Sequence, residues 1–238
     1  MTAPHFFADD VSGETVLLGR DDSRHALRVL RLRPGESMTI SDGSGSVVEA
    51  TVADASDRLV AHVTGRRSEP APRPLVHVFQ AIPKKGKLDL VVQKLTELGV
   101  ASVRPFAAAR SVPRWDEAKG GAHSARLREV ARQAAMQSRR AWIPEIHPPA
   151  ALEALDLDGV SVALHESAGR RLADALPDDA PDAVSIVVGP EGGLAEREVT
   201  ALRERGAEPV TLGPTILRTE TAALATVAIV LARYRLLG

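Results

Sequence analysis

The stretch VTLGPTILRTETAAL, residues 210–224, changes character twice over a short distance. Its first residues predict a β-strand, which Gly213 and Pro214 end. From residue 222 to residue 232 the chain is almost wholly apolar, which predicts a buried helix. Hydrogen-bonding side chains gather between the turn and this helix: Arg218, Thr219, Glu220 and Thr221. The stretch therefore predicts a strand, a tight turn and a helix whose start is unusually polar.

Two other predicted strands end in similar loops. The apolar run 183–188 leads into GPEGGL, and the run 160–165 leads into ESAGR. Ligands of parallel sheets lie beyond the carboxyl ends of the strands, where such loops meet. Glycine lets a ligand approach the bare main chain, so these loops predict a pocket suited to a flat polar ring such as adenine. An alternative for either glycine–proline loop, taken alone, is a tight strand-to-helix turn that has no ligand.

The loops match neither of the common nucleotide-binding patterns. No G-K-[ST] follows the glycines, and no G-x-G-x-x-G occurs, so neither a P-loop nor a conventional dinucleotide site is supported.

From residue 75 onward, apolar runs alternate with amphipathic helical patterns. This alternation is typical of an α/β fold with a parallel sheet covered on both faces. The predicted strands are 75–82, 100–106, 160–165, 183–188 and 208–212. The predicted helices are 87–98, 116–139, 169–176, 195–205 and 219–236.

The N-terminal part has a different pattern, with short β-like runs and tight turns that predict a small β-barrel. The runs are 14–18, 36–41, 46–53 and 58–64. One helical segment, DDSRHALRVLRL, interrupts them; Asp21, Asp22 or Ser23 fits its N-cap. Its inward residues are expected to be Ala26, Leu27, Val29 and Leu30. The proline-rich segment 66–74 reads as a linker, so we expect two domains, 1–70 and 71–238.

Composition narrows the class of protein. The 238 residues include no cysteine, which excludes disulfides and thiolate chemistry and fits a reducing cytoplasm. The seven histidines are scattered, so we expect no metal. The N-terminus does not resemble a signal peptide. The segment 222–232 has about half of the ~20 residues that cross a membrane. We therefore expect a cytoplasmic protein without a membrane partner.

Positive charge is concentrated near the N-terminus. Five arginines and a histidine lie between residues 20 and 33, although the net charge of the chain is −1. A basic patch on a nearly neutral protein favours a specific nucleic-acid surface. A solvated helix face explains the same charges equally well. The candidate RNA-binding residues here are Arg24, His25, Arg28, Arg31 and Arg33.

Other polar groups also fit two interpretations. Arg218 and Glu220 either form an ion pair at a helix start, with Thr219 as N-cap, or bind an anionic substrate and a cofactor. Arg139 and Arg140, at the end of a predicted helix, either complement its dipole or line a substrate cleft. The lysines before the helix 87–98 either reach phosphate or lie in a solvated loop: Lys84, Lys85 and Lys87.

Four ordered segments, QKLTELGV, RQAAMQSRRAWIPEI, VVGPEGGLAEREV and LGPTILRTETAAL, resemble motifs of the RsmE family. This family comprises the 16S ribosomal RNA uridine-N3 methyltransferases of the SPOUT class. SRHALRVLRLRPGE and DGSGS resemble its PUA-like RNA-binding barrel. The resemblance covers nearly the whole chain. It implies an S-adenosylmethionine-dependent enzyme, a homodimer, and a C-terminal parallel-sheet domain with a deep trefoil knot.

The resemblance also assigns roles to residues. It implies that the segment 212–222 is the last threaded loop of the knot. It carries cofactor contact onto Leu164, Gly189, Glu191, Gly193, Leu212, Gly213, Ile216, Leu217 and Thr219. Uridine N3 must lose its proton, and two mechanisms are open. Either Glu220 or Glu191 acts as a general base, or Arg218 stabilises the developing negative charge while solvent takes the proton. The alternatives to this function are a transfer RNA methyltransferase of the same class and a non-catalytic ribosome-assembly factor.

Overall fold

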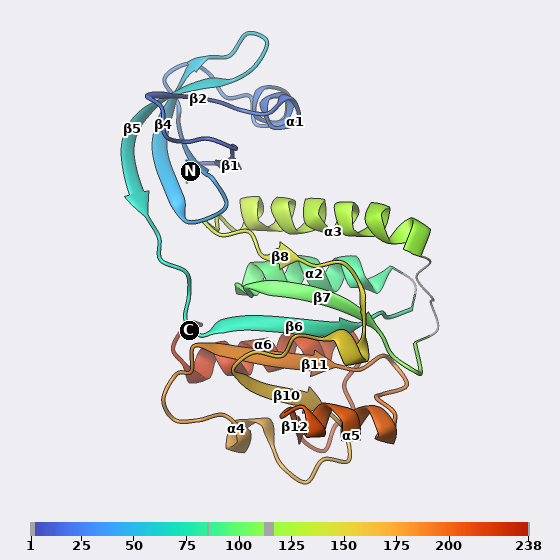
Figure 1. Cartoon of the computed structure of the whole chain (residues 1–238). Coiled ribbons are helices and arrows are strands. Elements are labelled where there is room, and N and C mark those ends of the chain that lie inside the picture. Colours follow the sequence, from blue (N-terminus) through green and yellow to red (C-terminus); the bar gives the residue numbers. More distant parts are fainter. Residues whose placement is uncertain (1–2, 85, 112–116, 238) are drawn as a thin grey trace. The chain divides into compact units, whose positions relative to one another are not determined.

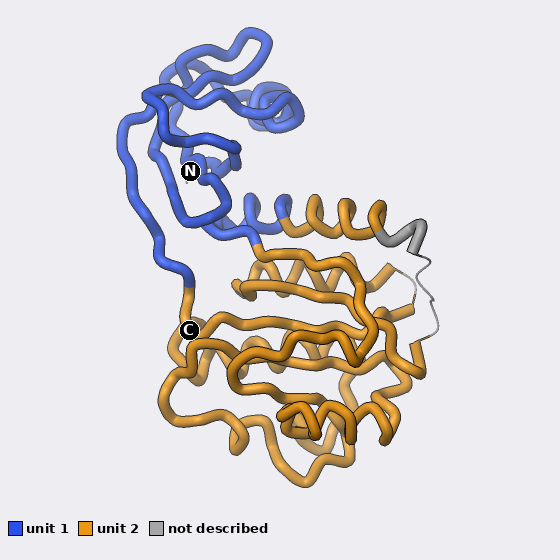
Figure 2. Tube along the Cα trace, viewed as in Figure 1, with its two compact units in different colours: residues 1–71, 132–143 blue, residues 72–131, 144–238 orange. Residues whose placement is uncertain are grey.

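The computed structural model describes residues 3–84, 86–111 and 117–237, so Lys85 lies outside the described residues. The chain divides into two compact units (Figure 2). Unit 1 consists of Met1–Ala71 and Arg132–Ile143, and unit 2 of Pro72–Ala131 and Pro144–Gly238. The expected domains, 1–70 and 71–238, are each one continuous segment. In the structure the later segment Arg132–Ile143 also belongs to unit 1. One reason is that Met136 packs against the core of the N-terminal sheet.

Unit 1 contains a five-stranded sheet of order β1-β3-β4-β5-β2 (Figure 1). The strands are β1 (His5–Phe7), β2 (Thr15–Leu17), β3 (Ser37–Ser41), β4 (Ser46–Asp54) and β5 (Val60–Ser68). β1 runs parallel to β3, and the other pairs are antiparallel. β5 extends into the segment expected as a linker, because Arg67 and Ser68 pair with Val47 and Ser46 of β4.

The helical segment of unit 1 differs from its prediction. Helix α1 (Arg20–Arg24) continues directly as a π-helix, η1 (His25–Val29). Its N-cap is Gly19, with no side-chain cap, and the three residues expected as N-cap, Asp21, Asp22 and Ser23, lie within the helix. The buried hydroxyl of Ser23 instead accepts a hydrogen bond from the Leu59 N–H at 3.1 Å. Val29 and Leu30, expected inside, are 65% and 43% exposed. The wider turn of the π-helix changes which side chains face inward.

Unit 2 contains a parallel sheet of order β12-β10-β11-β6-β7-β8, with β9 beside β7. Its strands are β6 (Leu75–Ala81), β7 (Ser102–Ala107), β8 (Glu145–Ile146), β9 (Ala150–Ala151), β10 (Val160–Leu164), β11 (Ala183–Val188) and β12 (Glu208–Val210). Every residue of β11 is buried, as expected for a strand covered on both faces. The predicted mixed α/β class with a parallel sheet is confirmed.

Helices accompany this sheet (Figure 1). They are α2 (Lys87–Leu98), α3 (Glu117–Gln137), the 3₁₀ turn η2 (Leu152–Ala154), α4 (Leu172–Ala175), α5 (Glu196–Glu204) and α6 (Thr219–Arg233). Val199 and Leu202 of α5 belong to one core cluster with Phe79 of β6 and Val187 of β11. α6 contacts β6, β11 and α2. None of the helices in the described part of the chain combines the length and hydropathy that a membrane span needs.

Candidate active site

A cavity of about 360 Å³ lies in unit 2, at the carboxyl ends of β10, β11 and β12. Residues of three connections form most of its wall: those after β10, those after β11, and those between β12 and α6. The volume falls within the range of roughly 300–1,000 Å³ that is typical of small-molecule sites. The structure thus has a cavity at the sheet edge where the polar loops were expected to meet.

All nine residues predicted to contact a cofactor line this cavity. They are Leu164, Gly189, Glu191, Gly193, Leu212, Gly213, Ile216, Leu217 and Thr219. Arg218, the first of the two predicted catalytic residues, lines it too. The second, Glu220, is not among the lining residues and lies one residue inside helix α6. The nine predicted cofactor residues lie up to 55 positions apart in the sequence, from 164 to 219.

The position of Gly189 is crowded for any side chain. A Cβ atom there would lie 3.0 Å from the Leu194 nitrogen and 3.1 Å from the Leu194 Cγ. The main chain after β11 therefore folds closely back on itself, and this closeness leaves bare backbone at the cavity wall. Such a cradle is the kind of surface that accepts a flat ligand edge.

Thr219 links two of the three connections. It is buried, and its hydroxyl donates a 2.6 Å hydrogen bond to the carbonyl oxygen of Gly189. The hydroxyl oxygen of Thr219 also accepts a 2.9 Å bond from Nε2 of the fully buried Gln80 on β6. Thr219 is not the N-cap of α6, which is Arg218. Its hydroxyl is directed across to the end of β11 instead of to its own helix.

Glu220 and Glu191 share one cation. Nζ of Lys87, the first residue of α2, lies 3.1 Å from Oε1 of Glu220 and 3.7 Å from Oε1 of Glu191. The backbone N–H of Lys84 also donates to Glu191 at 3.0 Å. Burial raises the pKa of Glu220, but its backbone hydrogen bond, Lys87 and Arg218 outweigh burial and leave the pKa below its ordinary value. Glu220 is therefore ionised at neutral pH.

A further cavity residue, Arg110, was not predicted. It follows β7, and its Nη1 donates a 2.8 Å hydrogen bond to the carbonyl oxygen of Gly192. The buried carboxylate of Glu198 holds the same connection, because it accepts from the N–H groups of Ala109 at 2.7 Å and Ala195 at 2.8 Å. The signal was available in principle, since Arg110 follows a predicted strand at the same sheet edge as the other loops.

The predicted RNA-binding residues of the N-terminal segment lie together in unit 1. Arg24, His25, Arg28, Arg31 and Arg33 are all exposed, on α1, on η1 and in the turn that follows. Arg24 forms an exposed ion pair with Asp21 at 3.3 Å. A pair so exposed contributes little stability, so these side chains remain available to a partner.

Arg139 and Arg140 belong to unit 1, whereas the cavity described above belongs to unit 2. Arg139 is exposed and Arg140 is partly buried. Burial lowers the pKa of the Arg140 guanidinium, an effect that Glu69 opposes. The prediction that these two arginines line a substrate cleft and contact RNA stays a prediction, and partial burial leaves less of the Arg140 side chain than of the Arg139 side chain open to a partner.

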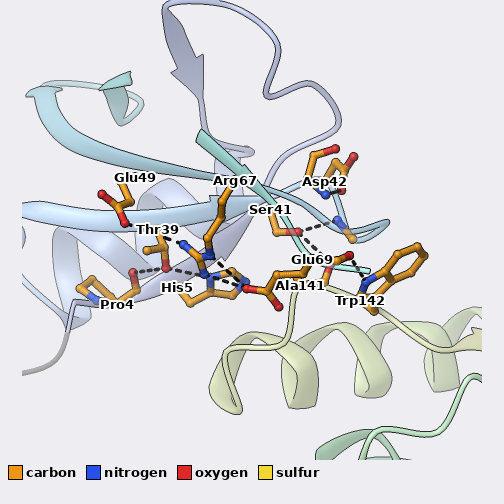
Figure 3. Close-up of polar contacts among 12 residues, drawn as sticks. Pro4, His5, Thr39, Ser41, Asp42, Glu49, Arg67, Glu69, Ala141 and Trp142 are labelled. Atoms are coloured by element: carbon orange, nitrogen blue, oxygen red, sulfur yellow. Dashed lines mark hydrogen bonds and ion pairs between the residues drawn. The ribbon is translucent and has the colours of Figure 1, made fainter. Parts of the chain in front are cut away.

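The polar contacts of the segment after α3 explain this placement (Figure 3). Oγ of Ser41 donates a 2.8 Å hydrogen bond to the carbonyl oxygen of Ala141, and Nε1 of Trp142 donates to that of Glu69 at 2.9 Å. A Cβ atom on Gly45 would lie 2.6 Å from the Trp142 ring, so the DGSGS turn needs its glycine for this contact. The turn serves as a docking site for the segment 139–143.

Metal chemistry finds no support in the described residues, where no group of three or more histidine or acidic side chains could hold an ion. This observation concerns only residues 3–84, 86–111 and 117–237.

Comparison with known proteins assigns the class. Residues 69–231 match the family of RNA methyltransferase domains, and residues 18–61 match the PUA domain of RNA methyltransferases. The chain is 38% identical over 234 residues to ribosomal RNA small subunit methyltransferase E of Mycobacterium bovis, covering 94% of this chain and 89% of that protein. It is 33% identical to the Bacillus subtilis protein of the same name, over 86% of this chain and 84% of the relative.

A solved structure agrees with these matches. Ribosomal RNA small subunit methyltransferase E from Neisseria gonorrhoeae, bound to S-adenosylmethionine, superposes with a TM-score of 0.87 and 30% identity, covering 97% of this chain and 98% of that one. The chain therefore belongs to the RNA methyltransferase family, in the group formed by the small subunit methyltransferase E proteins. The family expected from the sequence motifs is confirmed.

Proposed function

We propose that this chain transfers the methyl group of S-adenosylmethionine to N3 of a uridine in 16S ribosomal RNA, on the small ribosomal subunit. The observation that carries the proposal is that nine residues assigned to the cofactor line one cavity together with Arg218. The bound S-adenosylmethionine of the Neisseria gonorrhoeae relative supports the choice of cofactor.

The lining of the cavity suits such a cofactor. Leu164, Leu212 and Leu217 provide apolar surface, and the glycine-rich connection after β11 provides main-chain donors and acceptors. Ile216 lines the same cavity but is 79% exposed, an apolar surface that a ligand would cover. This combination matches a ligand with an aromatic ring, polar edges and a charged tail. When bound, S-adenosylmethionine supplies an electrophilic methyl group.

The chain's own residues must deal with the proton on uridine N3. Glu220 is a weak proton acceptor at neutral pH, because its pKa lies below the ordinary carboxyl value. Arg218 carries a fixed positive charge and lines the cavity. We therefore assign to Arg218 the stabilisation of the negative charge that develops on the pyrimidine as the proton leaves. Glu220, held by Lys87, keeps the start of α6 in place, and the proton passes to solvent.

Unit 1 supplies RNA affinity in this proposal. The exposed arginines of α1, η1 and the following turn would neutralise rRNA phosphates, which makes binding depend on salt. We infer a PUA-like domain that ends near residue 70 and a SPOUT methyltransferase domain in the remainder, with the segment 212–222 as the last threaded loop of a trefoil knot. The link between Thr219 and Gly189 is in keeping with that threading.

A homodimer in the cytoplasm is part of the same proposal. Leu90 of α2 and Ile229 of α6 are apolar but 45% and 39% exposed, on two helices that pack against each other. A second copy would cover such a face. Sedimentation of the wild-type chain should give a dimer, and the double variant Leu90→Asp/Ile229→Asp should give a monomer; a wild-type monomer would contradict this part.

The decisive experiment measures methyl transfer from labelled S-adenosylmethionine to small ribosomal subunits, free 16S rRNA and bulk transfer RNA. The subunits come from a strain that lacks the enzyme, and the modified nucleoside is identified. We expect label in N3-methyluridine of rRNA. Label confined to transfer RNA would show instead that the protein is a transfer RNA methyltransferase. Loss of both transfer and cofactor binding would favour a non-catalytic RNA-binding factor.

A further inference from the structure

Two apolar side chains stand out in the middle of the arginine-rich segment. Val29 is 65% exposed and Leu30 is 43% exposed. A single exposed apolar residue is ordinary, but here two adjacent ones lie between Arg28 and Arg31 in the sequence. The sequence pattern placed them inside the fold, so their exposure is a product of the local backbone.

The backbone that turns them outward is unusual in two ways. In the π-helix, the Leu30 N–H donates to the carbonyl oxygen of His25 at 3.1 Å, five residues back. Arg31 then adopts a left-handed conformation with φ 57°. Non-glycine residues adopt this conformation at a cost on the order of 1 kcal/mol. π-helical turns of this kind occur frequently at functional sites.

The neighbours of this turn are anchored in the core of unit 1. Ala26 is fully buried, and Leu27 and Leu32 pack against the same core cluster. The Leu32 N–H also donates to the carbonyl oxygen of Ala26 at 3.0 Å. The exposed pair is therefore presented by a short loop that is fixed at both ends, rather than by a segment that lacks packing.

The charges around Val29 and Leu30 favour a polyanion as the partner of this surface. Arginines lie on both sides of the pair in the sequence, and three carboxylates near this segment have contacts of their own within unit 1. Asp21 pairs with Arg24, the buried Asp22 pairs with Arg132, and a carboxylate oxygen of Glu36 accepts the Arg33 N–H at 2.8 Å. Phosphate groups are therefore the expected partners of the arginines. The bases attached to those phosphates would then lie next to Val29 and Leu30.

We propose that Val29 and Leu30 form an apolar wedge that contacts the faces of unpaired bases in rRNA, while Arg28 and Arg31 hold the adjacent phosphates. The wedge rests on the proposed role of this segment in RNA binding. Apolar side chains gain free energy by covering base surface that water otherwise contacts, and such wedges insert between bases in other nucleic-acid complexes. Unpaired RNA exposes base faces, whereas a duplex hides them, so the wedge favours looped over fully paired RNA.

The test compares the double variant Val29→Ser/Leu30→Ser with the wild-type chain. The probes are a 16S rRNA fragment with an unpaired loop and the same stem closed into an uninterrupted duplex, each titrated over a series of salt concentrations. Because the base contact is not electrostatic, we expect about tenfold weaker binding to the looped RNA at every salt concentration, with an unchanged slope of log K against log salt. Binding to the duplex should not change.

Two other variants make the result specific. Leu17→Ser, which removes an apolar side chain that is 49% exposed on β2, should bind both RNAs like the wild type. Arg28→Ala/Arg31→Ala should reduce the salt slope on both RNAs. Val29→Thr, which keeps the side-chain shape, should lose a smaller part of the affinity for the looped RNA, and it provides a result if the double variant folds poorly.

The outcomes separate the wedge from the proposed RNA-binding role. Wild-type affinity of the serine variant for the looped RNA overturns the wedge, while a reduced slope in the arginine variant keeps the role of the segment. An equal loss on the duplex also overturns contact with unpaired bases. Loss of self-association by the serine variant in sedimentation overturns it in favour of a second copy as the occupant. If neither variant changes RNA binding, the segment has no RNA-binding role and the wedge falls with it.

Discussion

The hydroxyl of Thr219 donates a 2.6 Å hydrogen bond to the carbonyl oxygen of Gly189, which joins the start of α6 to the end of β11. Gln80 completes the link from β6 through a 2.9 Å bond to the same hydroxyl. Three parts of the chain thus meet at one buried hydroxyl beside the cavity. The geometry of the proposed cofactor site depends on this group.

Replacement of Thr219 by valine keeps its shape and removes the link. Buried groups of Gly189 and Gln80 then have no partner at this position, at a cost of roughly 1–3 kcal/mol each. We expect a lower unfolding temperature and at least tenfold weaker binding of S-adenosylmethionine in calorimetry. The exposed neighbour Thr221→Val is the matched control and should resemble the wild type. Unchanged stability and affinity in Thr219→Val would contradict the role of the link.

Lys87→Met removes the cation that Glu220 and Glu191 share. The pKa of Glu220 should rise, because Lys87 is one of the groups that hold it below its ordinary value. A carboxylate with a depressed pKa adds stability above the ordinary carboxyl pKa, and this stability is lost as the pH falls through the depressed value. In the variant, activity should therefore begin to fall at a higher pH than in the wild type, and the part of the stability that is lost on acidification should be smaller.

The pH dependence of methyl transfer and of unfolding measures this shift. Lys87→Arg keeps the charge and should restore most of the wild-type profile. The matched control is Lys94→Met, on the same helix, where Lys94 pairs with Glu97 at 2.8 Å. An acid limb at the wild-type position in Lys87→Met would show that the cation does not act through Glu220.

Arg218→Ala tests the assignment of charge stabilisation. Removal of one preorganised donor to a developing charge reduces turnover by about 10²–10³-fold. Affinity for S-adenosylmethionine should change little, because main-chain groups and apolar side chains provide most of the cavity wall. The exposed Arg197→Ala on α5 is the control. A wild-type kcat in Arg218→Ala would refute the assignment.

The triple variant Arg24→Ala/Arg28→Ala/Arg31→Ala tests the electrostatic part of rRNA binding. Each arginine that neutralises a phosphate adds about 0.7–0.9 to the magnitude of the slope of log K against log salt, so the triple variant should lower that magnitude by about two to three. Filter binding or fluorescence anisotropy with 16S rRNA at several salt concentrations measures the slope. The methylation rate at saturating rRNA should stay near that of the wild type. A wild-type slope would exclude these arginines from the interface.

The burial of His5 predicts that unit 1 loses stability in acid. Burial lowers its pKa to about 4, and nearby Arg67 and Arg139 act in the same direction against Glu69 and the Arg140 backbone. The unfolded chain binds the proton near pH 6.5, so stability is complete above that pH and falls by about 3 kcal/mol as the pH drops to 4.

Denaturant unfolding between pH 7 and pH 4 checks the effect of His5. His5→Gln, which cannot take up the proton, should flatten this part of the stability profile, although it disturbs the 2.8 Å contact of His5 with Thr39 (Figure 3). The exposed His62→Gln should leave the profile unchanged. An equally steep profile in His5→Gln would place the acid sensitivity elsewhere.

Regular elements were predictable because their signals are local. Helix α2 has the predicted bounds, 87–98, since its apolar residues recur with the helical period between a glycine at each end. The place of the cavity was predictable for a related reason, because parallel strands place their carboxyl ends at one edge, where the glycine–proline loops meet. The nine individual cofactor residues were implied by the resemblance to the RsmE family. The short strand β1 was missed, because three residues carry too little periodicity.

Contacts between distant residues were not predictable in the same way. Lys87 reaches Glu220 across 133 positions, and Arg110 reaches Gly192 across 82. The Lys87–Glu220 pair has no sequence signal that distinguishes it from solvated charges, and the position of Arg110 after a predicted strand does not identify Gly192 as its partner. The partial burial of Arg140 was not predictable either, because it accompanies docking of the segment 139–143 onto the DGSGS turn.

The sequence by itself determined the α/β class, the N-terminal β-structure and the sheet edge at which the cavity lies, because hydrophobic period and strand-end composition are properties of the chain. Only the tertiary structure decided that Lys87 joins Glu191 to Glu220, and that Val29 and Leu30 face solvent. The first depends on how two helices pack, and the second on a π-helical turn fixed by core contacts on both sides. Both arise from packing between segments, which no local pattern records.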